Sequence, residues 1–313
     1  MGTARRGWWR STSSPSGRRS TSITAAACSG RRLTPASSAI PIDPATVRYL
    51  DVWGRRVRYL DQGVGHPLLL CHGFIGSLEN FHSWSPAFSG LRRVLIPDLP
   101  GFGETPAASA PHDVPAQARF LRAFADALGL GQHDLGGICL GATVALEYAR
   151  LDPGRVTRLV LHTPIYSPQT LHPWFKLQAS VLTLRPVFAI IDRLRRNRTV
   201  SDLYKRFLVE GPGVDRYDAQ VNFDNQCRAD GHTARSWLLD GIRRDYAAFL
   251  ERWEKPALIV VAADDRLVRV ERIRELARTM REAQVRVIEA AGHGWTPALI
   301  QAQVQAIAGF LAP

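Results

Sequence analysis

The segment GGICLGATVALEYA, residues 136–149, decides how the rest of the chain is interpreted. Its frame from Gly137 to Gly141 has the spacing Gly-x-Cys-x-Gly. A serine at the centre of such a frame lies on a sharp turn between a strand and a helix, where its oxygen acts as a nucleophile. Glycines on either side let the strand and the helix approach closely. Here Cys139 takes the central position, and it is a nucleophile, a relic of one, or an ordinary small buried residue.

On both sides of this segment, short apolar runs alternate with helical patterns. The runs predict strands at 67–71, 92–98, 133–137, 156–162, 256–263 and 285–290. Helical spacing of apolar residues predicts helices at 77–88, 113–130, 141–151, 270–282 and 297–312, with Ser77 and Asp113 as N-caps. Such alternation is typical of an α/β fold with a mostly parallel sheet covered on both faces. A hairpin around Trp53-Gly54 adds antiparallel strands at one edge.

Residues 163–250 interrupt this alternation. They hold no convincing strand but several amphipathic stretches separated by proline and glycine, and ordinary connections are only about 4–6 residues long. We therefore expect a helical insertion at 163–250, between core segments 46–162 and 251–313. Its aromatic side chains should mostly form its own core, and the others should line a pocket for a bulky, partly apolar substrate; they are Trp174, Phe175, Phe188, Tyr204, Phe207 and Trp237.

The formal charge of +12 is concentrated at the start of the chain. Residues 1–42 hold seven arginines and no acid, so the remaining 271 residues carry only +5. Without a basic helix or an aromatic-basic pattern in the body, the sequence predicts no nucleic-acid partner. Residues 1–45 are rich in Ser, Thr, Arg and Pro and are expected to be disordered. They fit either an organellar transit peptide or translation from a misplaced start upstream of a first strand near Val47.

The spacing of the cysteines and the lengths of the apolar runs indicate in which cellular compartment the protein is expected. Cys28, Cys71, Cys139 and Cys227 are widely scattered, which favours neither a disulfide framework nor a metal site. No apolar run approaches the ~18 residues that a membrane span needs. A cytoplasmic protein without metal or organic cofactor is the default expectation, and the oligomeric state stays open.

Four separated stretches together carry a family resemblance. They are CHGFIGS at 71–77, the turn at Cys139, VVAADDRLV at 260–268 and AAGHGW at 290–295. In this order they resemble the α/β-hydrolase superfamily, in the form with an inserted helical cap. The resemblance implies a mostly parallel, doubly wound sheet. It also implies a catalytic triad of Cys139, His293 and Asp265, with an oxyanion hole made by the backbone N–H groups of Phe74 and Leu140.

Two neighbouring carboxylates compete for the role of the acid. The family spacing Gly-x-x-Asp, with Ala262 in the place of the glycine, points to Asp265 and makes Asp264 a surface or loop-capping residue. Asp98 and His72 are interpreted as loop-shaping residues.

A cysteine nucleophile favours activated acyl substrates. A free thiol has a pKa of about 8.5 and ionises readily beside a histidine and a helix N-terminus. We therefore expect hydrolysis of an ester, lactone or thioester through a covalent acyl-enzyme. An acyltransferase or cyclase with the same triad is the first alternative, and a ligand-binding protein on a retired hydrolase scaffold is the second. The Gly-x-Cys-x-Gly frame also resembles dienelactone hydrolases, which lack a cap, and polyhydroxyalkanoate synthases, which are longer. The sequence leaves open whether Cys139 is natural or replaces a serine.

Overall fold

A computed structural model describes residues 41–109 and 111–312 of the chain. The extension expected to be disordered lies, up to residue 40, outside these described residues.

The described residues form an eight-stranded sheet in the order β1-β2-β4-β3-β5-β6-β7-β8. The strands are β1 Val47–Val52, β2 Arg55–Gln62, β3 Pro67–Cys71, β4 Arg93–Pro97, β5 His133–Ile138, β6 Val156–His162, β7 Ala257–Ala262 and β8 Ala283–Ile288. β1 and β2 pair as the predicted antiparallel hairpin, and β2 is antiparallel to β4. All the other pairs are parallel, because a helical crossover returns the chain to the same edge. The predicted doubly wound, mostly parallel sheet is confirmed.

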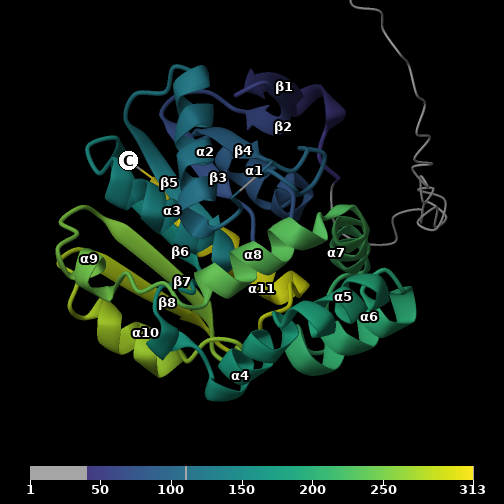
Figure 1. Cartoon of the computed structure of the whole chain (residues 1–313). Helices are drawn as coiled ribbons and strands as arrows, with labels where there is room; N and C mark the ends of the chain where they lie inside the picture. Colours follow the sequence, from purple (N-terminus) through teal and green to yellow (C-terminus); the bar gives the residue numbers. More distant parts are fainter. Residues whose placement is uncertain (1–40, 110, 313) are drawn as a thin grey trace, which may run out of the picture. The chain divides into compact units, whose positions relative to one another are not determined.

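Helices cover both faces of the sheet (Figure 1). The helices of the core are α1 Trp84–Phe88, α2 Val114–Ala127, α3 Leu140–Leu151, α10 Val270–Ala277 and α11 Pro297–Leu311, with short 3-10 turns η2 Pro44–Thr46, η3 Leu78–Phe81 and η4 Pro168–Thr170. α2 packs on α3, whereas α1 packs on α11. Asp113 caps α2 as predicted, since its side chain accepts a hydrogen bond from the backbone N–H of Ala116 at 2.9 Å.

The helix expected at 77–88 is wrong as a single element. The segment forms the turn η3 and the separate five-residue helix α1. Pro86 has no N–H to donate to the carbonyl group of His82, so a continuous helix would lose that bond. Asp98 also accepts the backbone N–H of Leu78 at 2.9 Å, which anchors the start of the segment to another loop.

Two element boundaries near the carboxyl end also differ from expectation. The helix expected to reach residue 282 ends at Ala277, where Thr279 and Met280 turn back with bonds to Leu276 and Ala277. The following strand begins at Ala283 instead of 285, since Ala283 already pairs with Ala257 of β7.

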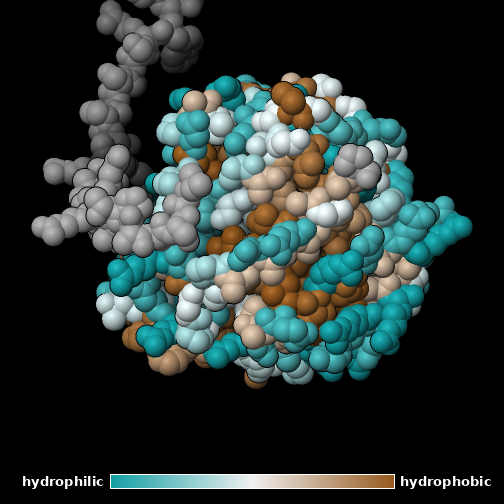
Figure 2. Space-filling model, turned by 180° about the vertical axis from the view of Figure 1, so that it is seen from behind, coloured by the Kyte–Doolittle hydropathy of each residue, from teal (hydrophilic) through white to brown (hydrophobic). Residues whose placement is uncertain are grey.

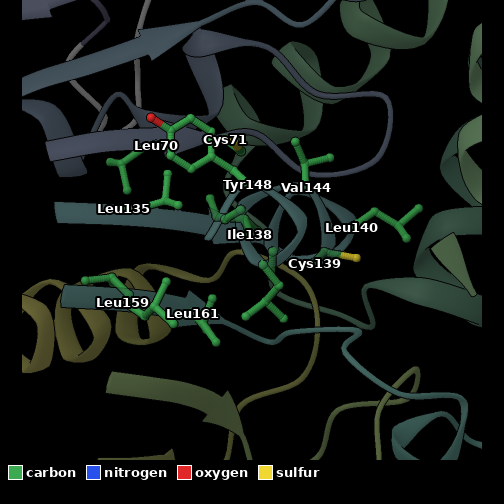
Figure 3. Packing of buried hydrophobic residues seen from close by; sticks show 14 of the residues in the cluster. Leu70, Cys71, Leu135, Ile138, Cys139, Leu140, Val144, Tyr148, Leu159 and Leu161 are labelled. Carbon is green, nitrogen blue, oxygen red and sulfur yellow. The ribbon is translucent and has the colours of Figure 1, made fainter. Parts of the chain in front are cut away.

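The core beneath the Cys139 turn is tightly packed. Every residue of β5 is buried. Leu70, Leu135 and Leu159 come from three neighbouring strands and pack with Val144 and Tyr148 of α3 (Figure 3). Figure 3 also shows Cys139 at the end of β5, with its sulfur directed away from this cluster. The packed ends of β5 and α3 therefore fix the position of the Cys139 thiol.

The close approach of α3 to β3 requires a glycine at residue 141. A Cβ there would overlap the carbonyl oxygen of His72 and lie 2.6 Å from that of Cys71. We expect Gly141→Ala to destabilise the fold by about 3 kcal/mol through overpacking, as measured by urea unfolding. Gly309→Ala is the matched control, because this helical glycine has open space around it. The control should gain about 0.5–1 kcal/mol of stability. Equal effects of the two changes would contradict this packing argument.

Between β6 and β7 the chain is helical. The inserted helices are α4 Pro173–Leu182, α5 Arg185–Leu194, α6 Arg198–Tyr204, a π-helical turn η5 Lys205–Val209, α7 Arg216–Arg228, α8 Gly231–Gly241 and α9 Ala247–Glu251. α7 was not expected from the sequence. Most of its residues are polar, and no apolar stripe along the helix marks a buried face. α4 to α8 gather at one end of the sheet in Figure 1, and we refer to residues 173–241 as the helical insertion.

The surface of this insertion is unusually apolar. Of fourteen large apolar side chains that are exposed in the described residues, ten lie between Trp174 and Leu208. Figure 2 shows apolar residues gathered between polar margins on one face of the molecule. In the described part of the chain, no single helix has the length and apolar character to cross a membrane, although α4 and α5, bent by 91°, meet that test together.

Candidate active site

Cys139 lies on a strained turn between β5 and α3. Its backbone angles are φ 54° and ψ −118°, a conformation that costs roughly 1–3 kcal/mol for a residue other than glycine. The Cys139 N–H donates to the carbonyl oxygen of His162 at 2.9 Å, and its own carbonyl oxygen accepts from Ala142 at 3.1 Å. Neighbouring elements thus hold the turn in place. The side chain is 8% exposed and lines a pocket.

His293 and Asp265 meet beside this pocket. Nδ1 of His293 donates a hydrogen bond to Oδ2 of Asp265 at 2.8 Å. Oδ1 of the same carboxylate accepts the backbone N–H groups of Leu267 and Val268 at 2.7 and 3.0 Å. With Nδ1 engaged, Nε2 is the ring nitrogen left for Cys139, and the two side chains interact. The structure therefore brings together the three residues that the sequence singled out.

The neighbouring carboxylate has a different position. The side chain of Asp264 is exposed, while its backbone N–H donates to the carbonyl oxygen of Ala291 at 2.8 Å. This bond ties the loop after β7 to the loop that carries His293. Asp264 thus helps to hold the loop of His293 through its backbone N–H, whereas the side chain of Asp265 contacts the imidazole of His293.

Burial and charge act against each other in this pair. Burial alone would lower the pKa of His293, but the Asp265 carboxylate and the Cys139 side chain raise it well above its usual value. Burial would raise the pKa of Asp265, but His293 and two backbone N–H groups lower it below its ordinary range. The arrangement therefore favours an imidazolium next to a carboxylate, with Cys139 adjacent to the positive ring.

Two backbone N–H groups are available for an oxyanion. Leu140 is the first residue of α3, so its N–H has no partner within the helix. Within the described residues, neither this N–H nor that of Phe74 donates to a protein group. Both residues line the same pocket as Cys139. This is the arrangement expected of an oxyanion hole, and such donors are typically worth about 10²–10³ in rate each.

His72 and Asp98 shape the surrounding loops. Nδ1 of His72 donates to the carbonyl oxygen of Gly73 at 2.9 Å, and Nε2 accepts from the N–H of Leu99 at 3.0 Å. Burial lowers the pKa of His72 to about 4, so the ring is neutral. Asp98 is fully buried and accepts Nε of Arg58 at 2.6 Å. Neither side chain lines the pocket.

The pocket has a volume of about 290 Å³ and extends from Cys139 into the helical insertion. Phe175, Phe188 and Tyr204 line it, as expected for part of the aromatic set. Trp237 is fully buried. The expectation for Trp174 and Phe207 is wrong, because both are exposed and neither lines the pocket. Helical spacing alone did not reveal which side of these helices faces the core.

The lining also includes polar side chains that the sequence did not single out. Lys205, Glu210, Asn222 and Gln226 line the pocket and are bonded to one another, and we call this group of four the polar end. Asn222 and Gln226 lie on α7, which the sequence did not predict, and no motif marks Lys205 or Glu210. Within the described residues, no group of three or more His, Cys, Asp or Glu side chains is placed to hold a metal ion.

The sheet order, the strained turn and the His–Asp pair define an enzyme of the α/β-hydrolase class. The family model for the alpha/beta hydrolase fold matches residues 66–294, and the chain belongs to this family. It is an enzyme of the esterase or acyltransferase kind.

Three known proteins illustrate the relationship. The acetyltransferase component of the acetoin cleaving system of Pseudomonas putida is 30% identical over 252 residues, covering 78% of this chain and 63% of that protein. The chain thus spans less than two thirds of this relative's length. A 2-hydroxymuconate semialdehyde hydrolase of a Pseudomonas strain is 28% identical over 266 residues, covering 81% and 89%. The solved structure of an esterase from Thermogutta terrifontis shares the fold, with a TM-score of 0.65, 24% identity and coverage of 88% and 98%.

Proposed function

We propose that this protein is a cysteine-dependent acyl hydrolase that cleaves an ester, lactone or thioester through Cys139, His293 and Asp265. The observation that carries the proposal is the position of Cys139 on the strained turn, next to a histidine whose pKa is raised. A buried cysteine without a chemical role needs neither feature, because strain of this kind persists mainly where function requires it.

The geometry supports a two-step reaction. The Cys139 thiolate attacks the acyl carbon, and the Phe74 and Leu140 N–H groups stabilise the oxyanion. The bond to the leaving group breaks as the leaving group takes a proton from Nε2 of His293, which leaves a thioester on Cys139. A water molecule then gives a proton to His293 as its oxygen attacks the acyl carbon. The bond between Sγ of Cys139 and the acyl carbon then breaks, which releases the carboxylic acid and restores the Cys139 thiolate beside protonated His293.

Acyl transfer is a second candidate for the same site. Leu182, Ile191 and Leu194 of the insertion line the pocket, and an apolar lining limits the access of water to an acyl-enzyme. A relative of 30% identity is named as an acetyltransferase component. An acceptor alcohol or amine would then take the place of water in the second step.

Intact-protein mass spectrometry tests both candidates. The protein is exposed briefly to a panel of acyl thioesters, and free acid is quantified in the same samples. We expect an acyl adduct on the protein together with rapid release of acid. An adduct that persists until an alcohol or amine is added would favour acyl transfer. The absence of both adduct and acid across the panel would contradict the proposal and favour a ligand-binding protein on this scaffold.

The proposal also covers the kind of substrate and the cellular location of the enzyme. The substrate is a small acyl compound, bulky and partly apolar, since apolar helices line most of the pocket. We also propose a cytoplasmic location, in which a nucleophilic thiol stays reduced.

A further inference from the structure

The polar end of the pocket lies directly beside the loop of His293. The N–H of Gly294 donates to the carbonyl oxygen of Glu210 at 3.1 Å. A Cβ on Gly294 would lie 2.7 Å from both that oxygen and the Cβ of Glu210, so the two segments pack closely. Glu210 therefore packs against the loop that carries His293, and both residues line the pocket.

A chain of side-chain amides orients the Glu210 carboxylate. Nδ2 of Asn222 donates to Oε1 of Glu210 at 3.0 Å, and Nδ2 of Asn80 donates to Oδ1 of Asn222 at 3.0 Å. Oδ1 of Asn80 in turn accepts the N–H of Ser77 at 2.9 Å and Nδ2 of Asn225 at 3.1 Å. Each amide thus donates its N–H toward Glu210, and the last of these bonds fixes the position of Oε1. No described residue hydrogen bonds to Oε2 of Glu210, although Glu210 lines the pocket.

Lys205 brings a positive charge to the same end. Its side chain is 9% exposed, lines the pocket and begins a π-helical turn, a feature frequent at functional sites. Gln226, in the orientation that satisfies its neighbours, accepts from Nζ of Lys205 at 2.9 Å. Arg195 also lines the pocket, but Asp192 compensates its charge through an ion pair of 2.6 Å.

The backbone N–H of Glu210 donates to the carbonyl oxygen of Lys205 at 2.7 Å, but the two charged groups influence each other without forming an ion pair. No ion pair of 4.0 Å or less joins them in the described structure. Burial lowers the pKa of Lys205 and raises that of Glu210, and the opposite charge of the partner resists each change. A ligand group that accepts from the ammonium and donates to the carboxylate would satisfy both. A carboxylate would be repelled by Glu210, and a second cation would be repelled by Lys205.

We propose that Lys205 and Glu210 bind the leaving group of the substrate, or the acceptor that replaces it, through a neutral group with both a donor and an acceptor, such as an amide or a hydroxyl. This inference rests on the proposed acyl chemistry of Cys139. His293 protonates the leaving group and deprotonates the acceptor, so both occupy the side of the pocket that Glu210 borders. The apolar remainder of the pocket then holds the acyl group.

Thioesters with one acyl group and four different thiols test this selectivity. The thiols are N-acetylcysteamine, with a neutral amide, propanethiol, 3-mercaptopropionate and thiocholine. We expect the wild type to show the highest kcat/KM for the N-acetylcysteamine ester, by roughly tenfold, because the other groups leave a buried charge unsatisfied.

Charge variants make the test specific. Glu210→Gln keeps the shape and removes the largest of the opposite charges that act on Lys205, so preference should shift about tenfold toward 3-mercaptopropionate. Lys205→Met removes the larger of the two opposite charges that act on Glu210, so preference should shift by a similar factor toward thiocholine. Glu254→Gln, whose side chain is 74% exposed on the surface, is the matched control and should keep the wild-type order.

Binding separates this inference from the proposed function. Affinities of Cys139→Ala for the uncleavable S-octyl thioethers of the same four thiols are measured by calorimetry, with and without the two charge changes. If the affinities follow the expected order but no thioester is cleaved, the proposed function fails and the polar-end assignment stands. An order that is unaffected by both charge changes, or a wild-type preference for the propyl group, would overturn the assignment.

Discussion

Cys139→Ala should lower kcat for acyl hydrolysis by roughly 10⁵–10⁶-fold, as expected when the nucleophile of a catalytic triad is lost. The change removes the atom that forms the acyl-enzyme, whereas the Phe74 and Leu140 N–H groups and the pocket remain. Residual turnover therefore reflects binding and oxyanion stabilisation alone. The measurement is thioester cleavage under saturating substrate, together with intact-protein mass.

Two further variants serve as comparisons for this result. Cys139→Ser keeps a nucleophile on the same turn, so we expect an acyl adduct of the same type to form more slowly. Cys227→Ala changes a half-buried cysteine in α7 and should leave the adduct in place. An adduct on Cys139→Ala with unchanged turnover would show that the strained turn has no catalytic role.

The core of the fold was predictable because its signals are local. Continuous apolar runs such as 67–71 and 156–162 mark buried parallel strands, and the structure has strands at both ranges. The structure also places Cys139, His293 and Asp265 together, although 154 residues separate the first two in the sequence. The resemblance to the α/β-hydrolase superfamily singled out these residues, and they meet because each follows a parallel strand and the carboxyl ends of such strands lie at one edge of the sheet.

The polar end of the pocket was not predictable in the same way. Glu210 and Asn222 gain their positions from hydrogen bonds between the insertion and the loops after β3 and β8. No periodic pattern encodes such contacts. α7 escaped detection for the same reason, since its buried face contains Asp218 and Asn225 instead of an apolar stripe. Both side chains are bonded to residues outside the insertion, Asp218 to His82 and Asn225 to Asn80.

The sequence alone left two candidates for the acid, and a matched pair of variants separates them. We expect Asp265→Asn to lower kcat/KM by roughly 10⁴-fold, because an amide can hold His293 in the wrong tautomer and cannot stabilise its charge. Asp264→Asn should change kcat/KM less than about twofold, since its exposed side chain makes no contact with the ring and its backbone bond to Ala291 is retained. The measurement is thioester turnover at pH 7.

The alkylation rate of Cys139 gives a second readout of the same pair. Asp265 raises the pKa of His293, so the imidazolium persists to higher pH in the wild type than in Asp265→Asn. The variant loses the positive ring beside the sulfur, and a neighbouring cation generally makes a cysteine more reactive toward alkylating agents such as iodoacetamide. At neutral pH we therefore expect slower alkylation in Asp265→Asn and an unchanged rate in Asp264→Asn. If Asp264→Asn instead slowed both alkylation and turnover, the acid would be Asp264, and the observed contact between Asp265 and His293 would be structural.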